Sequence, residues 1–326
     1  MEKRVENKKI AVLTSGGDSP GMNSAIQAIF LSAKKQNYTV YGVKDGYLGL
    51  YNNQIEILHI DDCSRVINTS GTFLGTARSL SFKNETTIRQ QCAQNLKNLG
   101  IHQLIVIGGD GSYHGAMKLE ELGIQCIGLP ATIDNDINKT DFTIGFSTSV
   151  NNVLDAIEKL RDTSLSHNRC TIIEVMGRYR GDLALYGGLA AGVDLIVTKE
   201  NNINKQFILD KVKKLKEQNK RHVIIVITEN IFNVHELAKE VESFSGFETR
   251  AQVLGHIQRG GIPTVEDRVL ATRMGHYAIQ LLNQNIHNCG ISLRKQKMTH
   301  FHFEDIFDDS NKVPNELFDI VNELTV

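Results

Sequence analysis

Short runs of β-branched and other apolar residues alternate with longer amphipathic stretches along most of this chain. The runs predict strands over residues 10–13, 39–43, 104–107, 125–129, 170–175, 195–197, 222–227 and 252–254. The stretches between them predict helices over residues 23–36, 86–99, 113–122, 148–160, 182–191, 205–218, 234–242 and 266–283. This alternation predicts an α/β fold with mainly parallel sheets flanked by helices on both faces. In open sheets of this kind ligands bind beyond the carboxyl ends of the strands, so chemistry is expected in the loops that follow strands.

The length of the chain, 326 residues, is enough for one large or two moderate domains, and 41% of its residues are hydrophobic, enough for a substantial core. The chain contains only four prolines and no linker-like or low-complexity tract. We therefore expect two Rossmann-like lobes rather than two tethered domains, with the first lobe covering residues 1–135.

The balance of charge and hydropathy argues against several classes of partner. A formal net charge of −1 does not favour a protein that binds nucleic acid through a bulk positive field. The charged N-terminus leads directly into a strand-like run, and no apolar segment approaches the length of about 18 residues that a membrane span needs. A cytoplasmic location with no membrane partner is expected.

The cysteines are odd in number, scattered, and without a C-x-x-C pair. This pattern favours reduced, mostly structural thiols over a zinc site or a disulfide framework. They are Cys63, Cys92, Cys126, Cys170 and Cys289.

An acidic segment follows the expected strand 125–129 and reads LPATIDNDINKTDFTIG over residues 129–145. Pro130 supplies no N–H and restricts the residue before it, so the strand should end there. Asp134 and Asp136 then stand two residues apart, and crowded carboxylates repel one another. A Mg²⁺ site, or a general base beside a second charge, would use such a pair. A turn is the alternative, because Asp and Asn are common in turns for local hydrogen-bonding reasons.

The first of two glycine-rich loops reads TSGGDSPGMN over residues 14–23 and opens a helix. Glycines let backbone amides approach an anion there, and the helix N-terminus favours phosphate. Gly16 and Gly21 are spaced as in a P-loop, but Met22 and Asn23 replace the Lys-Ser/Thr pair of a Walker A motif. A tight strand-to-helix turn is the alternative.

The second glycine-rich loop reads GGDGS over residues 108–112. The nearest dinucleotide-binding pattern would need glycine where His114 stands, so the Rossmann fingerprint fails. Asp110, between glycines, would be placed to hold Mg²⁺ on the phosphates of a nucleotide. A turn that binds nothing is again the alternative.

Seven motifs in these and later segments resemble those of the bacterial-type ATP-dependent 6-phosphofructokinases. They are LTSGGDSPGMN (13–23), IGGDGS (107–112), TIDND (132–136), DFTIGF (141–146), EVMGR (174–178), ETRAQVLGHIQRGG (248–261) and DRVLATRMG (267–275). They follow the order of that family and span about four-fifths of the chain. Several are long, so the resemblance is far more specific than a single glycine loop.

The resemblance implies transfer of the γ-phosphoryl group of Mg-ATP to the 1-hydroxyl of fructose 6-phosphate, giving fructose 1,6-bisphosphate and ADP. Asp134 matches the general base of this family, and Thr132 matches a contact to the transferred phosphoryl group. Asp110 matches the Mg²⁺ ligand, and Asp136 matches a residue that assists the metal-linked network.

The resemblance also implies which groups neutralise the phosphoryl charge. The amide of Gly17 and the guanidinium groups of Arg78 and Arg178 match these positions, and arginine suits them because it is always charged and binds bidentately. The implied ATP-binding positions are Gly17, Arg78, Ser79, Gly109, Asp110, Gly111 and Ser112.

The sugar phosphate site is implied in the second lobe. Its implied residues are Thr132, Asp134, Arg169, Met176, Gly177, Arg178, Glu229, Arg250, His256 and Arg259. Among them His256 and Arg259 match 6-phosphate ligands, whereas Arg169 and Arg250 match arginines that reach in from a neighbouring subunit, which implies a homotetramer. Taken singly, each has a plainer interpretation as a structural histidine or a solvated arginine.

The family pattern divides the chain between two lobes. It implies a larger nucleotide-binding lobe of residues 1–135, completed by the C-terminal segment from about 255 to 326, and a sugar-phosphate-binding lobe of residues 136–254. The active site is expected in the cleft between them.

The phosphoryl donor is inferred from two small residues. In pyrophosphate-dependent relatives an acid follows GGD and a lysine precedes TIDND, which fills space that an ATP phosphate would need. Gly111 and Ala131 stand at these places and favour ATP, although Ala131 departs from the usual glycine by one methyl group. Ser79, Leu80 and Lys83 stand where relatives vary, so the choice between ATP and GTP stays open.

The effector site of the family is depleted here. Basic residues that hold ADP or phosphoenolpyruvate in regulated relatives are replaced by Gln27, Leu31, Ile60 and Gln218. Four other positions of that site match, namely Ser64, Arg161, Asp194 and Lys220. Because charge-assisted bonds to these anions are lost, we expect weak or absent control by both effectors.

Other functions compete with an active ATP-dependent kinase. They are a pyrophosphate-dependent phosphofructokinase, a nucleotide or lipid kinase that shares only GGDGS, and a silent subunit that regulates a partner. A silent subunit would be expected to lose its base or metal carboxylate, yet Asp110, Asp134, Asp136 and Arg178 are all present.

Overall fold

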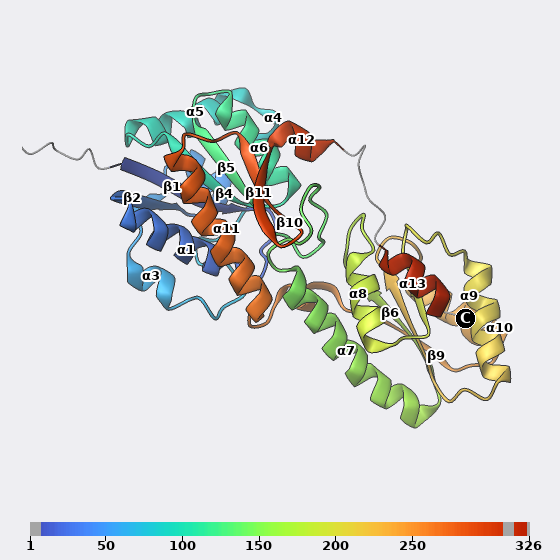
Figure 1. Cartoon of the computed structure of the whole chain (residues 1–326). Coiled ribbons are helices and arrows are strands. Elements are labelled where there is room, and N and C mark those ends of the chain that lie inside the picture. The colour runs from blue at the N-terminus through green and yellow to red at the C-terminus, as the bar shows by residue number, and fades with distance from the viewer. Residues whose placement is uncertain (1–7, 309–315, 325–326) are drawn as a thin grey trace, which may run out of the picture. The chain divides into compact units, whose positions relative to one another are not determined.

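The computed structural model describes residues 8–308 and 316–324, and these residues belong to two compact units (Figure 1). Of the described residues, unit 1 comprises residues 8–132, Ile137–Ser147 and residues 261–308. Unit 2 comprises Ile133–Asp136, Thr148–Gly260 and residues 316–324.

Unit 1 is built on a seven-stranded sheet in the order β11-β10-β5-β4-β1-β2-β3. Its strands are β1 (Lys8–Ser15), β2 (Tyr38–Val43), β3 (Ile55–Ile57), β4 (Gln103–Gly108), β5 (Gln125–Pro130), β10 (Cys289–Arg294) and β11 (Lys297–His302). The central strands are parallel, whereas β3 and β11 are antiparallel to their neighbours. The expected α/β fold with mainly parallel sheets is confirmed.

Helices cover both faces of this sheet (Figure 1). One face carries α1 (Met22–Lys35), α3 (Ile60–Ser64) and α11 (Val265–Asn283). The other carries α2 (Gly46–Tyr51), α4 (Leu80–Asn84), α5 (Thr86–Asn98), α6 (Asp110–Glu120) and α12 (Phe303–Phe307). Successive side chains of a strand point to opposite faces, so Ile10 and Val12 of β1 join the first core, and Ala11 and Leu13 join the second. Burial on both faces explains why β1 is a continuous apolar run.

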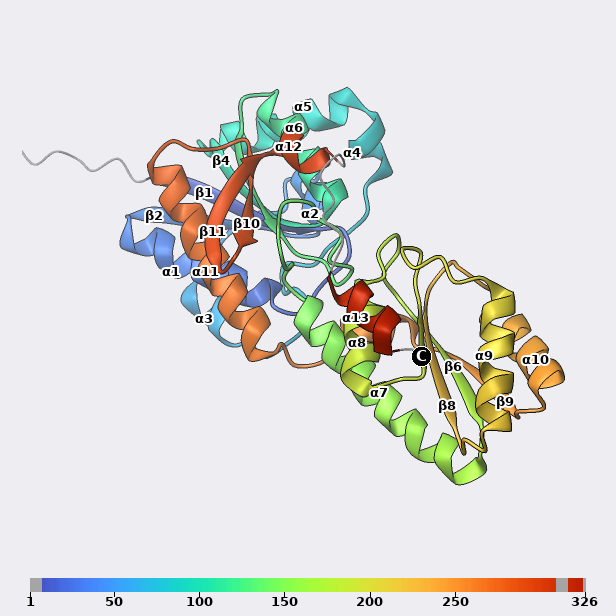
Figure 2. The same cartoon turned by 45° about the vertical axis from the view of Figure 1, so that its right-hand side comes forward.

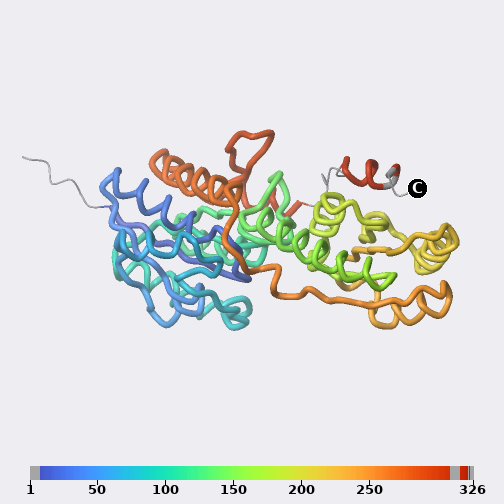
Figure 3. The backbone as a smooth tube through the Cα atoms, turned by 90° about the horizontal axis from the view of Figure 1, so that it is seen from below, coloured from blue at the N-terminus to red at the C-terminus, as the bar shows by residue number. Residues whose placement is uncertain are grey.

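The pattern of the sequence predicted neither the short strand β3 nor the hairpin β10–β11 of this sheet. The hairpin lies beside α11 (Figure 3), and Ile291 and Leu293 join the core against that helix. Its two-residue turn, Lys295 and Gln296, has φ of +47° and +66°. Such turns usually carry Asn or Gly, so no turn signal marks this position in the sequence.

Unit 2 is built on a smaller, fully parallel sheet in the order β7-β8-β6-β9. Its strands are β6 (Cys170–Val175), β7 (Leu195–Val197), β8 (Val223–Thr228) and β9 (Thr249–Val253). The helices α9 (Lys205–Glu217) and α10 (Val234–Ser245) cover one face (Figure 2). The other face carries α7 (Phe146–His167), α8 (Asp182–Ala191) and α13 (Leu317–Leu324). A short 3-10 helix, η1 (Gly255–Arg259), follows β9.

Most expected elements begin or end one to several residues away from the observed bounds. The helix expected over residues 148–160 extends over Phe146–His167 as α7, and the strand expected over 252–254 is β9, Thr249–Val253. The expected strand began too late because Thr249 and Arg250 are polar and do not extend the apolar run. These residues belong to β9 because their backbone pairs with β6. Among the described residues, no helix combines the length and the apolar character needed to cross a membrane.

Candidate active site

The first glycine-rich loop begins where β1 ends at Ser15. Gly16 and Gly21 have φ of +88° and +103°, a region that favours glycine, and Gly21 caps the N-terminus of α1. Gly17 lies exposed between them, in the loop that leads to α1. The loop is a strand-to-helix turn, and its anion-binding role stays a prediction.

Asn23, which stands where a Walker A motif has its hydroxyl residue, has a structural role. Its side chain is fully buried and donates to the carbonyls of Val66 and Gly71, at 3.1 and 2.9 Å. Its Oδ1 accepts from the amide of Phe73 at 3.0 Å. Thr76 also donates to the carbonyl of Gly16 at 2.7 Å. These bonds hold the segment that leads to Arg78 and Ser79 beside the first glycine-rich loop.

The second glycine-rich loop lies next to the first because β1 and β4 are neighbours, with Ser15 opposite Gly108. Ser112 donates from Oγ to the carbonyl of Ser15 at 3.0 Å. A Cβ on Gly108 would lie 2.4 Å from that carbonyl, so only glycine fits this contact. By contrast, a Cβ on Gly111 would meet nothing within 4 Å.

Asp110 opens α6, with Gly109 as the preceding cap residue. Its carboxylate is about half exposed, and its Oδ1 lies 3.7 Å from Nε2 of His114 one turn later. The ring of His114 stacks on that of Phe307 in α12, with centroids 3.7 Å apart. The described residues contain no cluster of three or more His, Cys, Asp or Glu that could hold a metal ion.

The acidic loop starts at the third neighbouring strand end. Ala131 donates its amide to the carbonyl of Gly108 at 3.0 Å and is buried in the core, and Thr132 donates its amide to Ile144 at 3.1 Å. Thr143 also holds the carbonyl of Thr132 through a 2.7 Å hydrogen bond. The strands β1, β4 and β5 thus bring both glycine-rich loops and Thr132 to one edge of the sheet of unit 1.

Asp134 is the buried carboxylate of this loop, with only 7% of its surface exposed. The pKa of Asp134 is raised to about 6, first by burial and second by the charge of Asp136. Glu229 raises this pKa further, while Arg259 and Arg178 lower it. A carboxyl group with such a pKa is mostly ionised at neutral pH and can still accept a proton efficiently.

The backbone around Asp134 is held in a specific conformation. Asn135 has a φ of +51°, which Asn tolerates better than most residues, and its side chain donates to Asp182 Oδ2 at 3.2 Å. Asp182 opens α8 and is itself buried. The sequence did not single out Asp182, because a carboxylate at the start of a helix is an ordinary capping feature.

Arg178 lies in the same unit as Asp134 and faces Asp136. Its Nη1 is 3.7 Å from Asp136 Oδ2, and its guanidinium carbon is 5.3 Å from the centre of the Tyr179 ring. The amide of Arg178 donates to Glu229 Oε1 at 2.8 Å. The predicted residues Asp134, Asp136, Arg178, Glu229 and Arg259 are therefore brought together electrostatically or by direct contact.

Gln258 connects the other segments that were predicted for the sugar site. Its side chain is fully buried and accepts from the amide of Met176 at 3.1 Å, while donating to the carbonyl of Gly255 at 2.9 Å. Gly177 has a φ of +140°, and a Cβ there would lie 2.3 Å from the carbonyl oxygen of Arg180. These contacts fix the EVMGR segment against η1, which carries His256 and Arg259. In the sequence, Gln258 lies within a long motif, and nothing about its residue type predicted this structural role.

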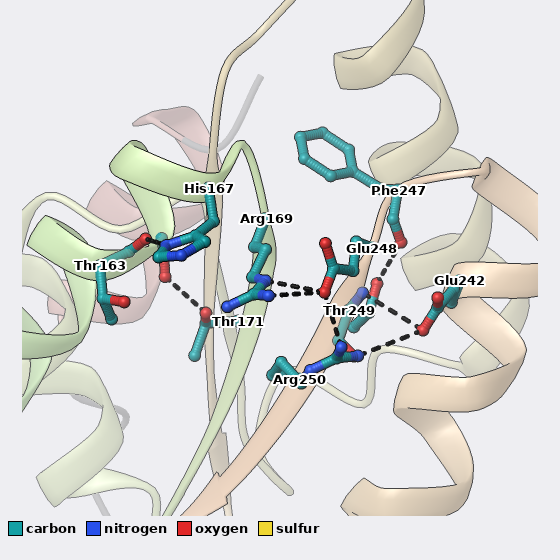
Figure 4. A network of polar contacts seen from close by, with 10 residues as sticks. Thr163, His167, Arg169, Thr171, Glu242, Phe247, Glu248, Thr249 and Arg250 are labelled. Carbon is teal, nitrogen blue, oxygen red and sulfur yellow. Dashed lines mark hydrogen bonds and ion pairs between the residues drawn. The ribbon is translucent and has the colours of Figure 1, made fainter.

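Arg169, which immediately precedes β6, and Arg250 of the neighbouring strand β9 lie on either side of Glu248 (Figure 4). Both contact Glu248: Arg169 donates from Nε at 2.8 Å and Arg250 donates from Nη2 at 2.6 Å, each to Oε1. The arginine hydrogen bond lowers the pKa of Glu248. The structure thus brings this predicted pair together within unit 2.

Three of the predicted effector-site residues lie in unit 2. Lys220 forms an ion pair with Asp194, whose Oδ2 accepts from the amide of Ile224 at 2.9 Å. Arg161 donates to the carbonyl of Ala191. In unit 1, Ser64 is exposed at the end of α3, and Leu31 and Ile60, two of the predicted replacements at that site, expose 48% and 43% of their surface.

Comparison with known proteins covers nearly the whole chain. The family model described as phosphofructokinase matches residues 9–282. Proteins named ATP-dependent 6-phosphofructokinase from Vibrio campbellii and Photobacterium profundum are each 49% identical over 318 residues, which is 97% of this chain and 99% of theirs.

Solved structures agree in fold. The structure of phosphofructokinase from Saccharomyces cerevisiae matches with a TM-score of 0.87 and 29% identity, over 98% of this chain and 48% of that one. A pyrophosphate-dependent phosphofructokinase from Marinobacter aquaeolei matches with a TM-score of 0.85 over 98% of this chain and 91% of that one, and at 21% identity this likeness shows the fold alone. On the family model and these full-length relatives, the chain belongs to the phosphofructokinase family.

Proposed function

We propose that this chain transfers the γ-phosphoryl group of ATP to the 1-hydroxyl of fructose 6-phosphate, giving fructose 1,6-bisphosphate and ADP, the reaction of a glycolytic kinase. The observation that carries the proposal is Asp134, a buried carboxylate with a pKa of about 6 between Asp136 and two arginines. It occurs in a chain 49% identical to proteins named ATP-dependent 6-phosphofructokinase. Phosphoryl transfer asks the protein mainly for positioning, charge neutralisation and a base.

Asp134 would act as the general base. As the bond between the γ-phosphorus and the bridging oxygen of ADP breaks, the sugar oxygen forms its bond to phosphorus and its proton passes to the Asp134 carboxylate. Thr132, two residues earlier, would contact the transferred group. Burial of Asp134 supports this role, because a base held away from water keeps the pKa that proton transfer near neutral pH requires.

The charge of the moving phosphoryl group would be neutralised by Gly17, Arg78 and Arg178. Gly17 is exposed in the loop that leads to the N-terminus of α1. Arg178 has a long ion pair of 3.7 Å to Asp136 and a largely exposed side chain, so little must be broken for it to turn to a phosphate. Asp136 would hold Arg178 near Asp134 until substrate binds.

Mg²⁺ fits the donor set around the second glycine-rich loop. Mg²⁺ in kinases is held by one or two carboxylates together with substrate phosphates, and the half-exposed Asp110 at the start of α6 supplies one such carboxylate. When bound, the ion would offset the negative charge of the nucleotide phosphates. Gly109, Gly111 and Ser112 would place backbone amides around those phosphates, with Ser79 and Arg78 nearby along the chain.

ATP is the proposed donor rather than pyrophosphate. The space around Gly111 is open, so an acidic side chain would fit there, and its absence leaves room for the nucleotide. Ala131 is neutral and buried. A coupled assay with fructose 6-phosphate and ATP, GTP or pyrophosphate tests this choice. Turnover with ATP is expected, a preference for pyrophosphate would contradict it, and no turnover with any donor would favour a silent regulatory subunit.

The sugar phosphate would be held by unit 2. Gly177 and Met176 lie in a segment fixed by Gln258, Glu229 accepts from the amide of Arg178, and η1 carries His256 and Arg259. Arg169 and Arg250 would complete the 6-phosphate site of a neighbouring subunit in a homotetramer. Analytical ultracentrifugation together with mixed tetramers of Arg250→Ala and Asp134→Asn chains tests this assembly, because cross-subunit sites predict that the mixture regains activity.

Control by ADP and phosphoenolpyruvate is proposed to be weak. Lys220, Asp194 and Arg161 are already engaged with one another or with backbone carbonyls, and the exposed Leu31 and Ile60 offer no charge. A saturation curve with fructose 6-phosphate, with and without millimolar phosphoenolpyruvate, provides the test. A strong shift to higher substrate concentrations, reversed by ADP, would contradict the proposal.

A further inference from the structure

Glu248 lies between Arg169 and Arg250, the two arginines that are proposed to bind the 6-phosphate of the sugar. Nε and Nη2 of Arg169 each lie 2.8 Å from Glu248 Oε1, and Nη2 of Arg250 lies 2.6 Å from the same oxygen (Figure 4). One carboxylate oxygen therefore receives the directional N–H groups of both guanidinium ions. A phosphate would need these same groups for bidentate binding.

The charges of this cluster cancel. Arg250 is also 3.7 Å from Glu242 Oε2, so two guanidinium groups face two carboxylates. The lowered pKa of Glu248 keeps its carboxylate ionised at neutral pH. A phosphate dianion gains little from approaching a neutral cluster, and gains more once one carboxylate has moved away.

The backbone around Glu248 is held by the sheet, whereas its carboxylate is held by arginine side chains. The Glu248 carbonyl accepts from the amide of Cys170 at 2.9 Å, and Thr249 pairs with Cys170 in the sheet. Arg169 is held in the same way, donating its amide to Ser164 at 2.9 Å. The Glu248 side chain is 39% exposed, so it can rotate toward solvent without disturbing β6 or β9.

We propose that Glu248 is an internal competitor for the sugar phosphate, occupying the guanidinium groups of Arg169 and Arg250 until a phosphate dianion displaces it. This proposal rests on the proposed function, in which both arginines bind the 6-phosphate. The competition favours sugars that carry a phosphate group, because a neutral sugar cannot replace the carboxylate on two cations. Glu248 thereby sets the substrate affinity without touching the reacting atoms.

The test replaces the carboxylate with the neutral amide of the same shape, Glu248→Gln. The KM for fructose 6-phosphate is expected to fall about two- to fivefold, the range that exposed ion pairs support, with kcat and the KM for Mg-ATP unchanged. An unchanged or raised KM would overturn the proposal, because it would mean that Glu248 is inert or orients the arginines for the substrate.

Glu242→Gln is the matched control, since it removes the same charge from the same cluster. Glu242 contacts Arg250 only at 3.7 Å and the amide of Thr249 at 3.4 Å. A smaller fall in KM is expected for this variant. An equal fall in KM would show that the effect comes from the net charge of the cluster. The proposal that Glu248 competes with the phosphate would then be rejected.

A binding measurement separates this proposal from the proposed function. The rise in unfolding temperature caused by fructose 6-phosphate alone, with no nucleotide, should be larger for Glu248→Gln than for the wild type, and an equal rise overturns the competition. Turnover by the wild type tests the reaction itself. If the wild type is active but Arg169→Ala and Arg250→Ala leave the KM for fructose 6-phosphate unchanged, the competition fails while the reaction stands.

Discussion

Asp134 and Glu248 are both carboxylates near two arginines in unit 2, yet their pKa values are shifted in opposite directions. Asp134 is buried, and the pKa of its carboxyl group rises to about 6 although Arg259 and Arg178 oppose the rise. Glu248 is solvated, and the hydrogen bond from Arg169 lowers the pKa of its carboxyl group. Burial, rather than the number of nearby arginines, explains why the two pKa values shift in opposite directions.

The difference indicates what each carboxylate can do. A buried carboxylate is poorly stabilised as an anion and so accepts a proton readily near neutral pH. A solvated carboxylate with direct arginine contacts stays ionised and acts as a fixed negative charge. The same side-chain chemistry therefore suits a general base in one place and a counter-ion in the other.

The largest expected effect comes from removing the buried carboxylate. Asp134→Asn should lower kcat by a factor of about 10³ or more, because general-base catalysis alone contributes about 10²- to 10⁴-fold and positioning adds to it. The coupled assay at saturating ATP and fructose 6-phosphate measures this. A kcat within tenfold of the wild type, in a variant with an unchanged unfolding temperature or a raised one, would remove Asp134 from the base role.

The next effect concerns the solvated cluster. Arg250→Ala should raise the KM for fructose 6-phosphate about ten- to a hundredfold, the range that hydrogen bonds to charged groups support, with a much smaller change in kcat. Arg221→Ala is the matched control, since Arg221 contacts Asn168 next to Arg169 but neither glutamate of the cluster. If both substitutions raised the KM for fructose 6-phosphate equally, Arg250 would act through its positive charge and not through direct contact with the phosphate.

Substitution of Asp134 and substitution of Glu248 should have different effects on the free energy of unfolding. Because the folded pKa of Asp134 is raised from 3.8 to about 6, the unfolded chain loses this proton first, and the folded protein loses stability as the pH rises from about 4 to about 6. Asp134→Asn should therefore raise the free energy of unfolding at pH 8 by about 1–3 kcal/mol. Glu248→Gln should not raise it, because that carboxylate is stabilised by arginine. Chemical denaturation at pH 8 measures both, and destabilisation by Asp134→Asn would contradict the buried-charge account.

The smallest expected effect is a shift in the pH profile. Because the base must be ionised, kcat/KM should rise with pH through about 6. Asp136 is the second cause of the raised pKa of Asp134, so Asp136→Asn should move this acidic limb to lower pH, whatever its effect on the maximal rate. Initial rates between pH 5 and pH 8 (about the range in which a general base titrates) give the profile. A limb that stays in place would show that Asp136 does not act on Asp134 electrostatically.

Much of the fold followed from local patterns in the sequence. The alternation of β-branched runs with amphipathic stretches predicted the mainly parallel sheets, because periodicity and β-branching act over a few residues. Pro130 ends β5 as expected, and both glycine-rich loops begin where β1 and β4 end. The hairpin β10–β11 escaped prediction because Lys295 and Gln296 adopt positive φ without any glycine or asparagine to mark the turn.

The sequence by itself determined which chemical groups stand at which strand ends, including the crowded pair Asp134 and Asp136. Only the tertiary structure decided that Asp134 is buried while Glu248 is solvated, and that Asn23 and Gln258 hold segments distant in sequence. The reason is physical. Residue type and spacing fix charge and local geometry, but desolvation depends on which distant segments pack around a group, and it is the largest cause of the raised pKa of Asp134.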